Sequence, residues 1–187
     1  MIILFGGSFN PPHVGHRIVA ESAYDEMKPE EFFILPTPNP PHKSATQLVS
    51  FDKRYHWCKR VFWGSYFTVS DIEAKLPVPS YTFQTLQFFS NYYSDIWLLI
   101  GEDSLRDFKK WYKWEEILNL ARLLVYPRFF DESGFKSSEV KFVRLYCPII
   151  DISSSYVRDR IEKGKTVKGY VDDSIVEDVV ATYKNVI

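Results

Sequence analysis

Cysteine is scarce in this sequence, neither sign of charge is in excess, and no long apolar run occurs. The only two cysteines, Cys58 and Cys147, form no C-x-x-C pair, so we expect reduced thiols in or near the core rather than a disulfide framework or a structural zinc site. A net charge of −1 gives no general attraction to nucleic acid or an anionic membrane. No segment reaches the roughly 18 apolar residues of a membrane span, and the apolar N-terminus is too short for a signal peptide. The expected location is therefore the cytoplasm.

Two common nucleotide-binding motifs are also missing. The chain contains neither the dinucleotide fingerprint G-x-G-x-x-G nor the P-loop G-x-x-x-x-G-K-[ST], which removes the main support for hydride transfer and for GTPase-type chemistry. Internal repeats, low-complexity tracts and linkers are absent as well. With 187 residues, of which 45% are hydrophobic, the chain suits one domain spanning residues 1–187.

At the N-terminus, an apolar run leads into a glycine-rich turn. Residues 1–5 carry no polar side chain and precede Gly6 and Gly7. This is the pattern of a buried parallel strand that ends in a turn where backbone N–H groups can approach a ligand. Two prolines follow, and from Val14 the apolar residues continue at helical spacing. The sequence thus predicts a strand, a polar turn and a helix.

Two histidines, His13 and His16, stand at the start of that helix. Their spacing of three residues predicts side chains on one face, near the end of the first strand. A helix N-terminus attracts anions, and imidazoles add donors, so the predicted ligand is a phosphate. A zinc site would need a third ligand, and neither the Glu of H-E-x-x-H nor a nearby Cys is present. Gly15 lowers helix propensity by roughly 1 kcal/mol relative to Ala, which indicates that another group packs against the backbone there.

Residues 6–16, G-G-S-F-N-P-P-H-V-G-H, resemble a known signature. It is the (H/T)-x-G-H signature of the nucleotidylyltransferase superfamily, in a form similar to that of the bacterial nicotinate-mononucleotide adenylyltransferases. The resemblance implies that the two histidines act in catalysis on the phosphates of ATP. It also implies an ATP-binding turn made of Gly6, Gly7, Ser8 and Phe9.

The rest of the chain alternates between apolar runs and helical patterns. Further strands are expected at residues 32–35, 66–70, 95–101, 122–127 and 141–145. Helices are expected at residues 52–63, 102–110, 115–121, 155–164 and 175–185, with another that begins at Ser80 or Thr82 as its cap and runs to about residue 92. This order predicts the α/β class: a single doubly wound, Rossmann-like domain with a mainly parallel sheet of five or six strands.

The helix at residues 52–63 is expected to be amphipathic. Its predicted core side consists of Tyr55, Cys58, Val61 and Phe62, and its predicted solvent side of Lys53, Arg54, Lys59 and Arg60.

A proline-rich loop follows the second strand and ends in His42 and Lys43. Such loops are often plain surface connections. These two side chains, however, follow the carboxyl end of a parallel strand, where open α/β sheets bind ligands. The loop also matches the P-P-H-[KR] element of the family, which implies that it closes over phosphates.

Two further segments match elements of the family that bind the pyridine nucleotide and adenosine. The resemblance of residues 80–86 implies that Thr82, beside Tyr81, meets a nicotinate carboxylate. Residues 100–112 match I-G-x-D-S-L and F-x-x-W-Y, which implies that Gly101 and Asp103 lie by adenosine and that Trp111 and Tyr112 lie by the pyridine ring. From the residues alone, Asp103 suits a ribose contact or a helix N-cap, and Trp111 suits a ligand contact or core packing.

Residues 152–158, I-S-S-S-Y-V-R, form a second anion-binding pattern. Three serines precede a helix, no acidic residue completes a capping box, and Arg158 adds a positive charge one turn into the helix. Free backbone donors are therefore expected. The segment resembles the family's I-S-S-T-x-[IV]-R motif, which implies that Ser153, Ser154 and Ser155 bind ATP and that Arg158 is catalytic.

The reaction implied is adenylyl transfer from ATP, with Mg²⁺, to nicotinate mononucleotide, which gives nicotinate adenine dinucleotide and pyrophosphate. Its partners are thus ATP and a pyridine mononucleotide, without nucleic acid or membrane, and no metal ligand is expected from the protein. Three alternatives stay open: nicotinamide mononucleotide as acceptor, phosphopantetheine as acceptor, and a nucleotide-binding regulator without turnover.

Overall fold

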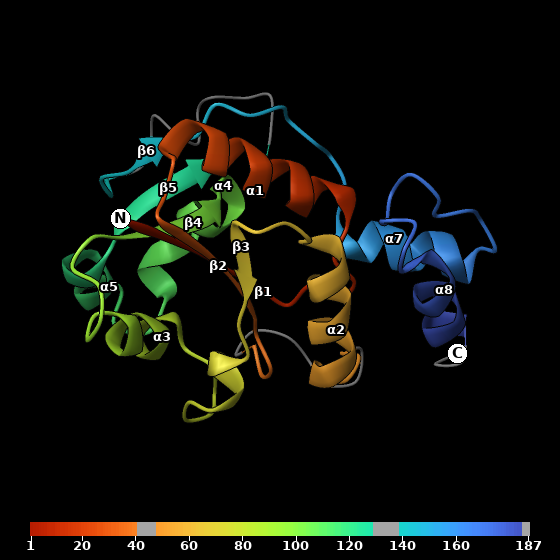
Figure 1. Ribbon diagram of the computed structural model, residues 1–187, viewed down its shortest axis with the longest axis horizontal. Helices are drawn as coiled ribbons and strands as arrows, with labels where there is room; N and C mark the ends of the chain where they lie inside the picture. Colours follow the sequence, from red (N-terminus) through yellow and green to blue (C-terminus); the bar gives the residue numbers. More distant parts are fainter. Residues whose placement is uncertain (41–47, 129–138, 185–187) are drawn as a thin grey trace.

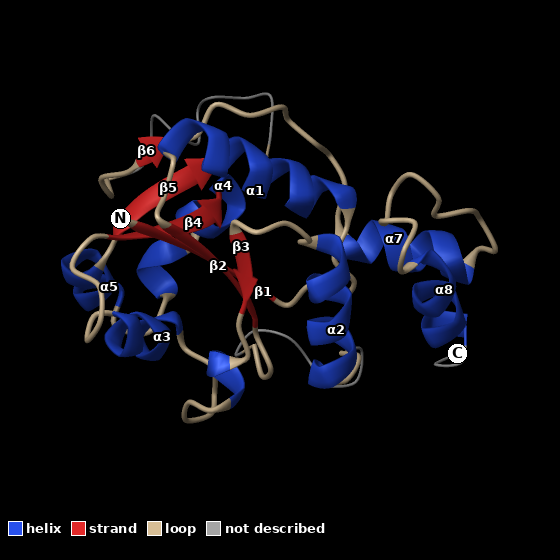
Figure 2. Cartoon of the chain, viewed as in Figure 1, coloured by secondary structure: helices blue, strands red, loops and turns tan. Residues whose placement is uncertain are grey.

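The computed structural model describes residues 1–40, 48–128 and 139–184. Six strands form one sheet: β1 (Ile2–Gly7), β2 (Glu31–Pro36), β3 (Phe67–Val69), β4 (Ile96–Gly101), β5 (Arg122–Tyr126) and β6 (Val143–Arg144). The helices that the structure describes are α1 (Val14–Met27), α2 (Phe51–Val61), α3 (Thr82–Phe89), α4 (Glu102–Arg106), α5 (Trp114–Leu120), α7 (Ser154–Glu162) and α8 (Val176–Lys184), with 3-10 turns η2 (Ile72–Ala74) and η3 (Phe108–Lys110). Figures 1 and 2 show helices on both sides of this sheet, so the predicted α/β class is confirmed.

The strand order is β3-β2-β1-β4-β5-β6, and every pairing is parallel. The chain therefore moves outward from β1 on one side and outward from β4 on the other. Because these two neighbouring strands send their connections in opposite directions, a crevice opens outside their carboxyl ends, which is where such sheets bind ligands. Gly7 ends β1 and Gly101 ends β4 at this crevice.

Side-chain alternation divides the interior into two apolar layers. Ile3 and Phe5 of β1 belong to the layer that also contains residues of α1, α2, α7 and α8, whereas Ile2 and Leu4 belong to the layer with residues of α3, α4 and α5. The strands β2, β4 and β5 contribute to both layers in the same way. Strands that are buried on both faces have continuous apolar sequences, which is why they could be predicted from the sequence.

The prediction for Arg54 was wrong. Instead of lying on the solvent side of α2 with Lys59 and Arg60, its side chain is fully buried and donates hydrogen bonds to backbone carbonyl groups. Helical periodicity places charged residues on the wet face by default, and it carries no information about a buried arginine that finds acceptors in distant loops.

The start of α3 also differs from the prediction. Neither Ser80 nor Thr82 caps the helix: the N-cap residue is Tyr81, whose own side chain makes no capping hydrogen bond. The Ser80 hydroxyl oxygen accepts instead from the backbone N–H of Asn39. The loop after β2 is thereby connected to the start of α3.

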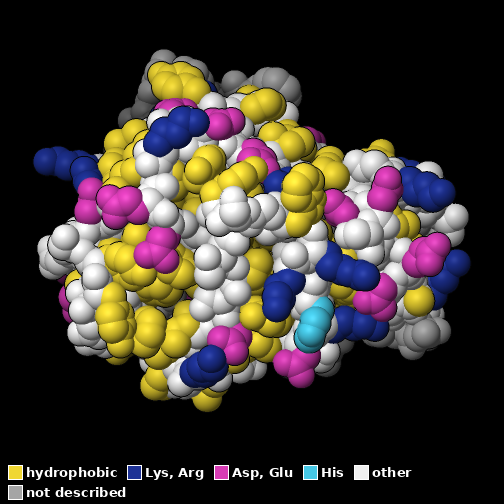
Figure 3. All heavy atoms as spheres, in the orientation of Figure 1, with side chains coloured by type: hydrophobic (Ala, Val, Ile, Leu, Met, Phe, Trp, Pro, Cys, Tyr) yellow, Lys and Arg dark blue, Asp and Glu magenta, His cyan; other side chains and the backbone are white. Residues whose placement is uncertain are grey.

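The surface shows no large patch of one charge on the face in Figure 3, where Lys and Arg side chains are interspersed with Asp and Glu. Within residues 1–40, 48–128 and 139–184, no helix combines the length and apolar character that crossing a membrane requires.

Candidate active site

The β1–α1 loop, residues 8–13, lies at the mouth of the crevice and is held by donors from distant segments. The Ser154 hydroxyl donates to the Pro11 carbonyl at 2.8 Å, and Arg158 Nη1 donates to the Asn10 carbonyl at 2.7 Å. From α8, the Tyr183 hydroxyl donates to Asn10 Oδ1 at 2.7 Å. The loop is therefore fixed by the C-terminal helices, more than 140 residues away along the chain.

Phe9 gives this loop its shape. It has a positive φ of 43°, and its ring is buried against those of Phe5 and His16. A side chain on Gly7 would place its Cβ 3.2 Å from the Phe9 ring. Gly7 thus leaves room for the turn that the sequence predicted.

His13 and His16 lie together, as predicted, although His13 is the N-cap residue of α1 rather than part of the helix. Their ring centroids are 3.7 Å apart. The His13 backbone N–H donates to His16 Nδ1 at 3.1 Å. Because Nδ1 is the acceptor, a neutral His16 carries its proton on Nε2, which makes that atom a hydrogen-bond donor.

The His13 ring is almost completely buried. Burial, and secondly the charge of Arg128, lowers the pKa of His13 from its ordinary value of 6.5 to about 3, so the ring is neutral at physiological pH. Neither ring nitrogen has a hydrogen-bond partner among the described residues. A Cβ on Gly15 would lie 3.1 Å from the His13 ring and 3.3 Å from Ile150. These are the groups that pack against the backbone of Gly15, as its position in the helix indicated.

The serine segment lies beside the β1–α1 loop. Ser153 is the N-cap of α7, and its hydroxyl oxygen accepts from the Tyr156 backbone N–H at 3.1 Å. One donor that the sequence predicted to be free is therefore occupied. Arg158 Nη2 donates to the Ser155 hydroxyl at 3.1 Å, and Ser155 is exposed. The N-terminus of α7 and the arginine thus approach the same loop as the histidine pair.

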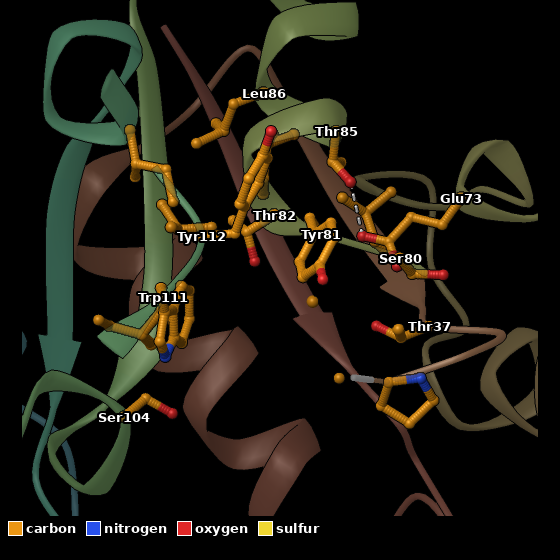
Figure 4. Close-up of a pocket in the computed structure, with 18 of the residues that line it drawn as sticks. Thr37, Glu73, Ser80, Tyr81, Thr82, Thr85, Leu86, Ser104, Trp111 and Tyr112 are labelled. Carbon is orange, nitrogen blue, oxygen red and sulfur yellow. Dashed lines mark hydrogen bonds between the residues drawn. The ribbon is translucent and has the colours of Figure 1, made fainter. Parts of the chain in front are cut away.

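A cavity of about 470 Å³ occupies the crevice on the β1–β4 side (Figure 4). Aromatic residues form one wall: the rings of Tyr81 and Tyr112 are 4.6 Å apart, and Trp111 lies beside the buried Phe108 at 5.2 Å. Trp111 therefore meets both of its predicted descriptions, since it borders the cavity and packs on the core. Predicted residues that line this cavity are Gly6, Gly7, Ser8, Tyr81, Thr82, Asp103, Trp111 and Tyr112.

Asp103, which the resemblance placed by adenosine, lines the large cavity. It is the second residue of α4, whose N-cap is Gly101, so its carboxylate is not the helix cap. It lies 3.6 Å from Arg128 Nε. A Cβ on Gly101 would lie 3.0 Å from the ring of the buried Tyr126, which leaves little room for a side chain at the end of this strand.

The histidine pair does not line the large cavity. His13 and His16 border a small separate depression together with Tyr126, Arg128 and Ile150. The β1–α1 loop borders both hollows, because Ser8 lines the large one and His13 the small one. His42 and Lys43 lie outside the described residues, whereas Thr37 and Pro40 of the same loop line the large cavity.

Sequence analysis missed Glu73, a buried carboxyl group at the wall of the cavity. Its Oε1 accepts from the Thr85 hydroxyl at 2.9 Å (Figure 4). Burial raises the pKa of Glu73 from 4.5 to about 7, and the hydrogen bonds from the Thr85 and Thr37 side chains offset only part of this effect. A single Glu in a short turn carries no signal of burial in the sequence.

The raised pKa of Glu73 predicts how stability changes with pH. Because the folded state holds the proton more tightly than the unfolded state, this stabilisation is complete below pH 4.5 and is lost as the pH rises through 7. Relative to Glu73→Gln, which keeps the shape and an acceptor for Thr85, the native chain should lose about 2 kcal/mol of unfolding free energy between pH 5 and pH 7. Urea unfolding of both proteins across this pH range measures the difference. Unfolding free energies that change with pH in parallel for the two proteins would contradict the prediction.

The lowered pKa of His13 predicts that the free energy of unfolding changes with pH in the opposite direction. Its pKa is lowered in the folded state, so its stabilisation is present above pH 6.5 and disappears as the pH falls towards 3. Relative to His13→Gln, the native chain should gain about 2 kcal/mol between pH 5 and pH 7. The same urea unfolding experiment tests this expectation. A native chain that becomes less stable than His13→Gln as the pH rises would show that His13 is not buried as a neutral ring.

The chain is similar in sequence to known proteins. The family model for cytidylyltransferase-like proteins matches residues 4–160. A relative from Fervidobacterium nodosum, described as a probable nicotinate-nucleotide adenylyltransferase, is 38% identical over 97% of this chain and 89% of its own length. A relative from Thermosipho melanesiensis with the same description is 39% identical over 98% and 96%.

A solved structure supports the fold. The Plasmodium falciparum nicotinic acid mononucleotide adenylyltransferase complexed with NaAD superposes with a TM-score of 0.79 at 20% identity, covering 99% of this chain and 96% of that chain. The family match and the two relatives, which align over nearly the whole chain, establish that the chain belongs to the cytidylyltransferase-like family.

Proposed function

We propose that the chain transfers the adenylyl group of ATP to nicotinate mononucleotide and releases pyrophosphate. A 5′-phosphate oxygen of the mononucleotide attacks the α-phosphorus of ATP, and the bond from that phosphorus to the β-phosphate bridge breaks. The observation that carries the proposal is the junction at the β1–α1 loop. There a histidine pair and the α7 N-terminus stand on one side, and an aromatic cavity opens on the other.

The residues around the β1–α1 loop suit the ATP phosphates. His16 offers Nε2–H, His13 is a neutral ring with unpartnered nitrogens, and Arg158 and the exposed Ser155 stand at the N-terminus of α7. Such preorganised donors stabilise the charge that develops on phosphorus-bound oxygens. Gly6, Gly7 and Ser8, at the end of β1, would contact the nucleotide where it enters the crevice. Asp103 would accept hydrogen bonds from the ribose hydroxyl groups.

The aromatic cavity suits the pyridine ring and its carboxylate. Trp111 and Tyr112 provide flat apolar surface. Thr82 begins α3, and the positive end of the dipole of that helix favours a negatively charged group. A nicotinate carboxylate therefore fits this end of the cavity better than an uncharged amide.

No nucleophilic side chain is needed, because the mononucleotide phosphate is the nucleophile. Mg²⁺ would enter on the phosphates of ATP, where it neutralises charge on the departing pyrophosphate. Among the residues that the structure describes, no group of three or more His, Cys, Asp or Glu side chains is arranged to hold a metal ion. His42 and Lys43 are proposed to close over the phosphates from the loop after β2.

Pyrophosphate release tests the proposed reaction directly. ATP and Mg²⁺ are supplied with nicotinate mononucleotide, nicotinamide mononucleotide or phosphopantetheine, and a strong preference for the first is expected because of the charge at the α3 N-terminus. Preference for another acceptor would contradict the assignment of the pocket. ATP binding without release of pyrophosphate from any acceptor would favour a regulator.

His16→Ala should lower the rate at least about 10²–10³-fold, because it removes a donor to the charged oxygens. The protein should remain folded, as measured by thermal unfolding. His56→Ala is the matched control, since His56 is exposed on α2. A rate for His16→Ala near that of the control would overturn the catalytic role.

A further inference from the structure

Arg54 is a buried guanidinium whose partners are all backbone carbonyl groups. Its Nε donates to Val49 at 2.7 Å, and its Nη1 donates to Ser8 at 2.6 Å and to Thr37 at 2.9 Å. Nη2 lies 3.4 Å from the carbonyl oxygen of Pro38. The side chain itself has no exposed surface.

The charge of Arg54 is not neutralised by an acidic group. Among the ion pairs of the described residues none involves Arg54, although surface arginines and lysines of the chain have carboxylate partners. The titratable groups that act on it are Cys58 and Tyr183. Burial raises the pKa of both, so they are uncharged at neutral pH. Carbonyl dipoles and the Phe51 ring, whose centroid is 5.9 Å from Cζ, stabilise the cation without a counter-ion, and a buried charge that no anion pairs is costly.

The carbonyl partners belong to the two loops that border the crevice. Ser8 begins the β1–α1 loop, and Thr37 and Pro38 follow β2, the strand paired with β1. The Thr37 backbone N–H also donates to the Gly7 carbonyl at 2.8 Å. One guanidinium therefore holds the ends of two adjacent strands together on the protein side of the proposed phosphate site. Lysine, a single point charge without a planar fork, cannot bind these carbonyls in the same way.

We infer that Arg54 is a positioning residue for ATP: it fixes the β1–α1 loop and supplies a permanent positive charge behind it that the triphosphate neutralises. This inference rests on the proposed function, because it requires a polyphosphate at that loop. It explains why a cation is buried where an apolar side chain would fill the same space at lower desolvation cost.

Steady-state kinetics with ATP and nicotinate mononucleotide varied separately test the inference. Arg54→Met should raise KM for ATP about tenfold or more, while KM for the mononucleotide changes less than about twofold. Arg54→Lys should recover part of the ATP affinity, because it restores the charge without the fork. Lys59→Met is the control, since it removes an exposed positive charge from the same helix and should leave both constants unchanged.

The outcomes separate this inference from the proposed function. Equal effects on both KM values, or a folded Arg54→Met with native ATP affinity, would overturn the inference. If Arg54→Met does not fold, the two KM values of Arg54→Lys are compared in the same way. If neither variant folds, Arg54 serves the fold alone, which would contradict the inference. If the native chain releases no pyrophosphate, the proposed function fails, and the dissociation constant of ATP measured calorimetrically with the same variants still tests Arg54.

Discussion

The backbone of the β1–α1 loop is the constraint on which the rest of the site depends. Three residues of this loop, Ser8, Asn10 and Pro11, accept hydrogen bonds through carbonyl or amide oxygens from donors on α2, α7 and α8. None of these helices adjoins the loop in sequence. The loop is therefore fixed only when the whole domain has folded, which keeps its conformation preorganised for a charged ligand rather than dependent on it.

This arrangement also explains the electrostatics of the crevice. Two cations contact the loop, Arg54 and Arg158, and both donate hydrogen bonds to its uncharged carbonyl groups. Burial keeps the His13 ring uncharged. Positive potential is thus built into a chain whose net charge is −1. On the opposite wall, Glu73 is buried with a raised pKa, which limits negative charge near the cavity for the nicotinate carboxylate.

The strands and most helices could be predicted because apolar runs and glycine stops are local signals, as at residues 1–7 and 95–101. The proximity of His13 and His16 also followed from their spacing in the sequence. Arg54, Glu73 and the tie from Tyr183 to Asn10 could not be predicted, because each depends on a partner brought close by the fold. The cap of α3 was wrong for the same reason: Ser80 binds Asn39, a residue 41 positions earlier.

Hydrogen exchange with a non-hydrolysable ATP analogue tests the central claim, that the β1–α1 loop and the α7 N-terminus form one phosphate site. Backbone amides at residues 8–16 and 153–158 should gain protection together when the analogue and Mg²⁺ are added. Residues 81–86 and 108–112 should gain protection only when nicotinate mononucleotide is present as well. Protection by the ATP analogue that leaves residues 8–16 unchanged would contradict the account.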